Sequence, residues 1–122
     1  MGTWGAGNFE NDTAADHLSA LTGRFISDIE EALREPAKIE ADEYWGSCLP
    51  CNIELLTMLA KAGYAGVMIP QPDEVSRWRN TFMEVWESTV DHLNPRQGYK
   101  AKRRLALEKT FDELELIAKQ RD

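Results

Sequence analysis

The strongest constraint on the fold is an apolar stripe between residues 73 and 94, where large apolar side chains recur every three or four positions. That spacing places them on one face of an α-helix, which must then be buried against a partner. Four further segments repeat the pattern, and no stretch alternates apolar and polar residues as a half-buried strand does. The 122-residue chain is therefore predicted to be a single all-α domain over residues 1–122, a small bundle of about five amphipathic helices. The expected helices cover residues 13–21, 24–34, 41–62, 73–94 and 99–119.

Glycine and proline determine where these helices are expected to end. Gly23 should separate the first two helices, and Pro36 should end the second, because proline has no N–H for the next helical hydrogen bond. Pro50 leaves two readings, one helix that kinks near this residue or a new helix capped by Ser47. The kinked helix is favoured because the apolar spacing keeps its phase across the proline. Gly63 is expected just beyond the end of that helix.

The first twelve residues show no helical pattern and are expected to form an irregular arm that packs on the bundle. Trp4 and Phe9 are its large apolar anchors, and Trp4 is expected to be a buried plug. The three glycines of the arm should adopt backbone angles that other residues avoid. A phosphate-binding loop is not expected, because the arm has no Lys or Arg and leads into carboxylates that would repel a phosphate. The residues able to cap the following helix are Asn11, Asp12 and Thr13, with Asp16 placed for a capping box.

The arm also carries a family resemblance. The pattern Trp-Gly-x-Gly-x-Phe-Glu-Asn-Asp-x-Ala-x-Asp, over residues 4–16, resembles the opening of the domain of unknown function 4259 family, small proteins found largely in bacteria. The likeness is thinner but continuous to about residue 115, and the chain departs from it at residues 46–51. It implies a helical fold and no settled activity. The motif residues, for which a structural role is expected, are Trp4, Gly5, Gly7, Phe9, Asp12, Ala14 and Asp16.

The negative charge of the chain is concentrated in its first half. Of a net charge of −7, the whole excess lies in residues 1–63, since acids and bases balance in residues 64–122. Such a surface repels nucleic-acid phosphates and attracts a basic protein. We call the densest part of this region the acidic face, and it contains two bases, Arg34 and Lys38. The acidic face comprises Asp28, Glu30, Glu31, Glu35, Glu40, Asp42 and Glu43.

These features predict a non-catalytic module that binds a basic protein partner through the acidic face. By analogy, its concrete form is an immunity-type inhibitor of a basic toxin or nuclease. The alternative is a small enzyme or ligand-binding domain that uses His17 with Asp12 and Asp16 beside the arm. A deep pocket beside Trp4 would favour the alternative, and a flat acidic face without such a pocket would favour the protein-binding module. The second half of the chain contains a basic segment, with Arg96, Lys100, Lys102, Arg103 and Arg104. We expect it to pair with carboxylates of the same molecule or of a second copy, so a homo-oligomer remains one of the expected forms.

The remaining candidate chemistry is weak. Cys48 and Cys51 have the spacing of a zinc or redox pair, but zinc needs four ligands and a redox pair of this kind normally follows a strand. They are expected to be two small buried apolar residues. No metal, cofactor or catalytic residue is predicted. No apolar run approaches the roughly 20 residues of a membrane helix, and no secretory signal pattern opens the chain, so a cytoplasmic location is expected.

Overall fold

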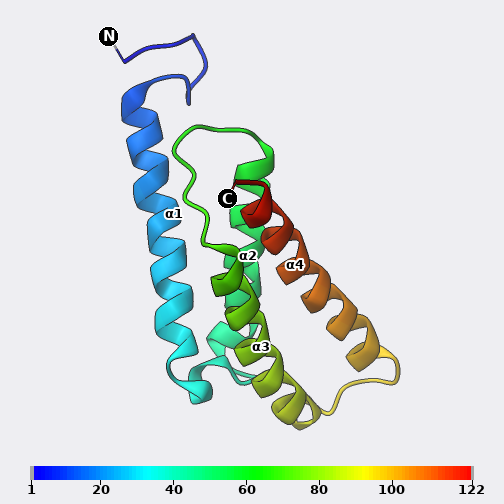
Figure 1. The fold of residues 1–122 in the computed structure, drawn as a ribbon. Coiled ribbons are helices and arrows are strands. Elements are labelled where there is room, and N and C mark those ends of the chain that lie inside the picture. The colour runs from blue at the N-terminus through cyan, green and yellow to red at the C-terminus, as the bar shows by residue number, and fades with distance from the viewer. Residues whose placement is uncertain (1, 122) are drawn as a thin grey trace.

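The computed structural model describes residues 2–121, which form a bundle of α-helices without a β-strand (Figure 1). Met1 and Asp122, the first and last residues of the predicted domain, lie outside this range. The all-α class is confirmed, but the described residues hold four α-helices and two short 3-10 helices in place of about five helices. In chain order they are α1 (Asp12–Leu33), η1 (Pro36–Ile39), α2 (Tyr44–Lys61), α3 (Pro72–Thr89), η2 (Val90–Leu93) and α4 (Tyr99–Arg121).

The two helices predicted on either side of Gly23 are one continuous helix, α1. A glycine inside a helix costs only about 0.5–1 kcal/mol, and the buried side chains of α1, from Leu18 to Ala32, span that position. Asn11 is the residue that caps α1, because its side-chain oxygen accepts a hydrogen bond from the Ala14 N–H (2.8 Å). The predicted capping box from Thr13 is wrong, since the helix has already begun there.

Helix α2 continues through Pro50, as the unbroken apolar phase predicted. Its start lies three residues later than expected, at Tyr44, because residues 40–43 form a turn. Gly46 lies against the carbonyl of Glu40 in that turn, so closely that any side chain at this position would collide with it. The helix ends as predicted, with Gly63 beyond its last turn at a φ of +77°.

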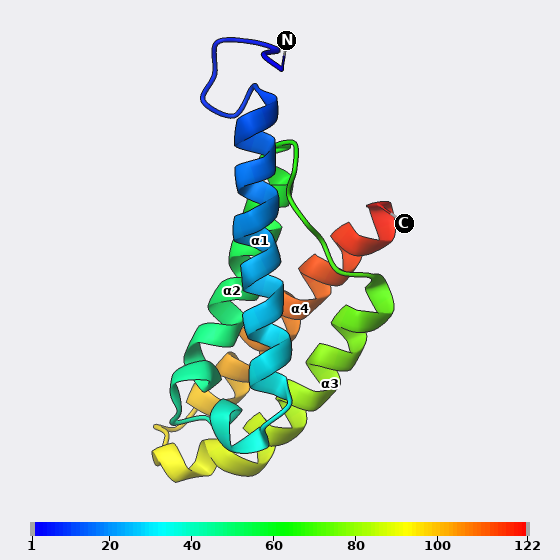
Figure 2. The same ribbon diagram turned by 90° about the vertical axis from the view of Figure 1, so that its left-hand side faces the viewer.

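The four α-helices share one apolar core. α4 packs against α2 and α3, while α1 packs mainly against α2 and more sparsely against α3 (Figures 1 and 2). The predicted apolar stripe of α3 is confirmed from Val75 to Val90, although Leu93 at the end of η2 is 40% exposed. The apolar residues with helical spacing in α4, Leu107, Phe111, Leu114 and Ala118, are all buried. The core consists of Ile29, Ala32, Ile39, Leu49, Ile53, Leu56, Val75, Trp78, Phe82, Trp86, Val90, Leu107, Phe111, Leu114 and Ala118.

An irregular segment, residues 62–71, returns from the end of α2 to the start of α3 along the side of α1 (Figure 1). Gly66 lies there at a φ of +93° and packs on the backbone of Ala15, so that this segment approaches α1 more closely than a side chain would allow. Its hydrogen bonds fix it to α1 and to the end of α4. They run from Ser19 Oγ to the Gly66 carbonyl (2.7 Å), from the Met68 N–H to Thr22 Oγ1 (2.9 Å), and from Arg121 Nη1 to the Val67 carbonyl (2.8 Å).

Within residues 2–121, every helix is too short or too polar to cross a membrane.

Candidate functional site

The acidic face lies at one end of the bundle, where α1 ends, η1 follows and α2 begins (Figure 1, in cyan). The chain reverses direction between α1 and α2 (Figure 1), so carboxylates that are up to fifteen positions apart come to one end of the molecule. Four of the seven are exposed, and the other three are half-buried. The exposed ones are Glu31, Glu35, Asp42 and Glu43, and the half-buried ones are Asp28, Glu30 and Glu40.

The carboxylates of the acidic face are left almost without ion pairs. Within residues 2–121, the pair between Lys38 and Glu35 (3.7 Å) is the one that involves them. The other ion pairs of the described residues connect α2, α3, η2 and α4, including Arg79 with Asp112 (2.6 Å). The negative charge at this end is therefore presented to solvent.

Two of the five residues of the basic segment form ion pairs within the described part of the chain, and their partners lie in the same half of the sequence. Lys100 contacts Asp91 (3.2 Å), and Arg104 binds Glu87 with two of its nitrogens while its guanidinium lies 5.5 Å from the centre of the Trp86 ring. The hydrogen bond with Arg104 lowers the pKa of Glu87, and the same bond raises the pKa of Arg104. The basic segment thus does not neutralise the acidic face.

The arm folds back on itself before α1 begins. Thr3 and Asn11 form an isolated antiparallel bridge, and the Trp4 N–H donates to the Glu10 carbonyl (2.8 Å). The indole Nε1–H of Trp4 donates to Asp12 Oδ1 (3.1 Å), which ties the ring to the first turn of α1. Trp4 is 53% exposed, so the predicted buried plug is wrong. The ring cannot reach the core, because the arm pairs with itself instead of crossing the bundle.

The glycines of the arm serve a different purpose from the one predicted. None of them has a left-handed backbone, since the positive-φ glycines among the described residues are Gly63, Gly66 and Gly98. Instead, the carboxylate of Glu10 folds over Gly5 and Gly7, where a Cβ would meet it. A side chain at Gly5 would therefore have to displace the carboxylate of Glu10 from its present position.

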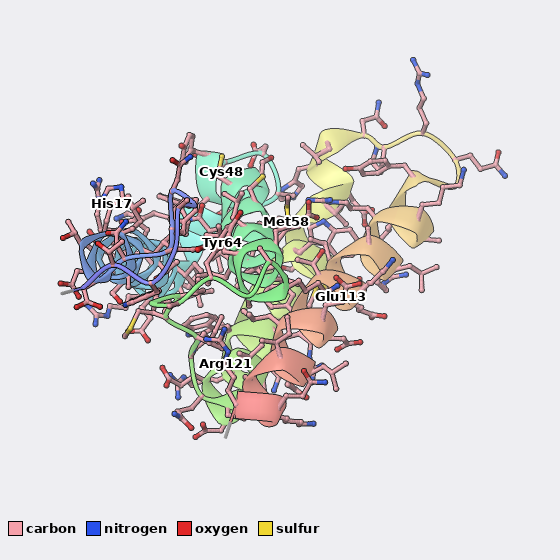
Figure 3. All side chains as sticks on the ribbon, turned by 90° about the horizontal axis from the view of Figure 1, so that it is seen from above. His17, Cys48, Met58, Tyr64, Glu113 and Arg121 are labelled. Atoms are coloured by element: carbon pink, nitrogen blue, oxygen red, sulfur yellow. The ribbon has the colours of Figure 1, made fainter. Side chains whose placement is uncertain are left out.

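Beside the arm is a half-open cavity of about 590 Å³, lined by Trp4 and residues 7–10 of the arm and by residues 62–65 after α2. We call it the arm cavity. Phe9 and Tyr64 form part of its wall as a stacked pair, with ring centroids 4.3 Å apart. Figure 3 shows Tyr64 between α1 and α2, on the side where the arm passes. The cavity places three aromatic rings and one carboxylate, that of Glu10, around a common space.

The three residues of the predicted alternative site do not line this cavity. Asp12, Asp16 and His17 follow one another on the first turns of α1 and are all exposed. His17 lies on the outer side of the helix, away from Tyr64 (Figure 3). The carboxylate of Asp12 is occupied by the Trp4 indole. The structure therefore brings a pocket to Trp4 but does not bring His17 into it.

Cys48 and Cys51 are not the buried pair that was predicted. Cys48 is half-buried and Cys51 is exposed, because Leu49, Pro50 and Ile53 occupy the inward face of α2. The Cys51 thiol donates to the carbonyl of its own helix at Ser47 (3.4 Å). A hydrogen bond with Cys48 raises the pKa of Tyr44. No group of three or more metal-binding side chains is found within residues 2–121.

Sequence reasoning missed Tyr64 and the role of Glu10. The available signal was the placement of Tyr64 in a short segment bounded by Gly63 and Gly66, which indicates an aromatic side chain held in a loop. Nothing in the linear order connects that loop to the arm.

The comparisons with known proteins give one result. The sequence model of the family described as Domain of unknown function (DUF4259) matches residues 2–113. No curated protein and no solved structure matches the chain.

Proposed function

Because the chain belongs to the family described as Domain of unknown function (DUF4259), its function must be argued from its own surface, and we propose that it is a non-catalytic module that binds a basic protein. The binding surface is the acidic face. A single observation carries the proposal: these carboxylates have one ion pair among the described residues, Lys38 with Glu35, whereas the other seven ion pairs of those residues join charges of α2, α3, η2 and α4.

Unpaired charge of one sign is useful for association and of little use for folding. Exposed like charges repel one another, so their concentration at one end slightly destabilises the bundle. The same concentration attracts a partner of opposite sign and raises its association rate. Nucleic acid is not proposed as a partner, since phosphates would be repelled. The concrete form that we favour is an immunity-type inhibitor of a basic toxin or nuclease, which is an analogy with other small acidic proteins.

The test compares two charge-reversal variants of equal size. The first variant changes three residues of the acidic face to Lys: Glu31, Asp42 and Glu43. These carboxylates are exposed and have no ion pair within the described range. The matched control changes three carboxylates outside the acidic face to Lys: Glu54, Glu84 and Glu108. They are also exposed and without an ion pair in that range.

The wild type is used to capture proteins from an extract of the source organism, and each purified candidate is then titrated against all three proteins. We expect a basic partner whose dissociation constant rises at least about tenfold with the first variant and stays near the wild-type value with the control. Its association rate should fall as the salt concentration rises to 0.15 M, where the Debye length is about 8 Å. Equal affinity for both variants would show that the acidic face is an ordinary solvated surface.

A second candidate function, ligand binding, is favoured by the arm cavity. A deep pocket beside Trp4 is the feature expected of the alternative, and the structure has a half-open cavity of about 590 Å³ there. Its site differs from the predicted site, because Glu10 and Tyr64 line it whereas His17 and Asp16 do not. The combination of three aromatic rings with one carboxylate favours the recognition of a ligand over a reaction on it.

A further inference from the structure

We propose that the arm cavity binds an organic cation of the alkylammonium class. The Trp4 ring and a free outer face of the stacked Phe9–Tyr64 pair would attract the charged group, and the carboxylate of Glu10 would balance its charge. The inference rests on the second candidate function, that this cavity binds a ligand, and adds the chemical class of the ligand.

The first argument is the concentration of aromatic surface. Three aromatic side chains from two distant segments line one cavity, and two of them remain substantially exposed, Trp4 at 53% and Tyr64 at 38%. Of the other three tryptophans, Trp78 and Trp86 are 2% exposed and belong to the core, and Trp45 is partly buried against it. Aromatic faces carry partial negative charge and attract ammonium groups, tryptophan most strongly.

The second argument is electrostatic. Glu10 is the one charged residue among those that line the cavity, and neither Lys nor Arg lines it. The described part of the arm, residues 2–11, contains no base. Within residues 2–121, Glu10 has no ion pair. An anion would be repelled by Glu10, and a neutral apolar ligand would gain nothing from its charge, whereas a cation is attracted both by the rings and by the carboxylate.

The third argument is preorganisation. The Trp4 ring is held by its hydrogen bond to Asp12 (3.1 Å), and the Phe9 ring is held by its stack on Tyr64. The segment that carries Tyr64 is itself fixed to α1 through the bond from Ser19 to Gly66. Groups that are already in place lose little freedom when a ligand binds, so a small cation can be held without reordering the arm.

The test uses choline and its uncharged isostere 3,3-dimethyl-1-butanol, which have the same shape and differ in charge. Binding is followed through the indole N–H signals in ¹H–¹⁵N NMR spectra, where the buried Trp78 and Trp86 are internal controls. We expect choline to shift the Trp4 signal to saturation with a dissociation constant on the order of 1 mM. The isostere should bind at least about fivefold more weakly. Nα-acetyl-lysine methylamide is titrated in parallel as a model of a lysine side chain in a protein. Tighter binding of choline indicates a free ammonium ligand, and tighter binding of the lysine derivative indicates a protein side chain.

Substitutions then test the residues. Glu10→Gln should weaken choline binding at least about fivefold, whereas Glu54→Gln, an exposed carboxylate on α2 outside the cavity, should not. An unchanged Trp4 indole signal in the free Glu10→Gln protein verifies that the arm is intact. Equal binding of choline and its isostere, or full affinity in Glu10→Gln, would overturn the cation assignment while leaving a ligand site.

The absence of a saturable shift with every probe up to 50 mM would overturn the second candidate function together with this inference. The triple reversal of Glu31, Asp42 and Glu43 lies at the other end of α1 from the arm (Figure 2) and should leave choline binding unchanged. The choline experiment therefore succeeds or fails independently of the protein-binding proposal.

Discussion

Glu115 of α4 shows how one carboxylate is tied into the bundle by neighbours on two helices. It accepts a hydrogen bond from Ser76 Oγ of α3 (2.5 Å) and pairs with Lys119 one turn along its own helix (3.1 Å). Its side chain is only 15% exposed. The hydrogen bond from Ser76, followed by that from Lys119, lowers its pKa below the usual value of 4.5. The ionised form is thus the one that stabilises the fold.

The predicted consequence is a stability that depends on pH at this residue. Because the pKa is lower in the folded than in the unfolded state, the contribution is present above pH 4.5 and is lost as the pH falls below it. Glu115→Gln should reduce the free energy of unfolding by about 1 kcal/mol at pH 6, and the difference should shrink towards about pH 3. Urea unfolding of both proteins across this range measures it. Glu54→Gln, an exposed and unpaired control in the described range, should give no such trend. A Glu115→Gln difference that stays constant with pH would contradict the assignment.

At the scale of elements, two helical glycines illustrate different demands on the sequence. Gly23 lies in the middle of α1, and a Cβ placed there would come within 4 Å of no described atom outside the adjoining backbone of its own helix. Gly46 lies in the first turn of α2, where a Cβ would meet the carbonyl of Glu40. Gly23 therefore only lowers the stability of α1, which packing restores. Gly46 is required because α2 and the turn before it are in close contact.

Replacing each by alanine should have opposite effects. Gly23→Ala should increase the free energy of unfolding by about 0.5–1 kcal/mol, because alanine restricts the unfolded chain and favours the helix. Gly46→Ala should decrease it by about 1–3 kcal/mol, because the residue 40–43 turn must move. Chemical unfolding followed by circular dichroism measures both. A destabilising Gly23→Ala would mean that α1 needs a break at that position after all.

At the scale of the whole molecule, the segment of residues 62–71 joins parts that lie far apart in sequence. Thr22 is the central contact, because its buried hydroxyl accepts from the Met68 N–H (2.9 Å) while donating to the Leu18 carbonyl of its own helix (2.6 Å). The same segment carries Tyr64 to the arm cavity. The position of that cavity therefore depends on a contact between α1 and a loop that starts forty residues later.

Thr22→Val keeps the side-chain shape and removes the hydroxyl, which leaves the Met68 N–H without its partner. We expect a loss of about 1–2 kcal/mol in the free energy of unfolding and faster hydrogen exchange at Met68. The control is Thr110→Val on α4, whose hydroxyl makes the same bond within its helix, to Ala106 (2.8 Å), and no bond to another segment. Similar losses in both variants would show that the tertiary hydrogen bond contributes nothing.

Much of the fold could be predicted from local patterns. The buried faces of α3 and α4 follow directly from three-and-four spacing, as at Val75, Phe82 and Phe111. The helix running through Pro50 was also predictable, since the apolar phase was unbroken. The error at Gly23 arose because a single unfavourable residue was given more weight than continuous burial along α1.

The candidate sites were less accessible from the sequence. The composition of the acidic face was evident, but whether Lys100 and Arg104 would neutralise it depended on which helices pack side by side. The arm was recognised as irregular, yet its pairing with itself, and hence the exposure of Trp4, follows from hydrogen bonds that no periodicity encodes.

By itself the sequence determined the helices, their inward faces and the lopsided charge, because each depends on residues close together in the chain. Only the tertiary structure decided the partners of those charges and the arm cavity. Both require segments distant in sequence to meet, Phe9 with Tyr64 and Arg104 with Glu87. Such meetings are set by how whole helices pack, a balance of burial and chain entropy over the entire molecule that local spacing does not contain.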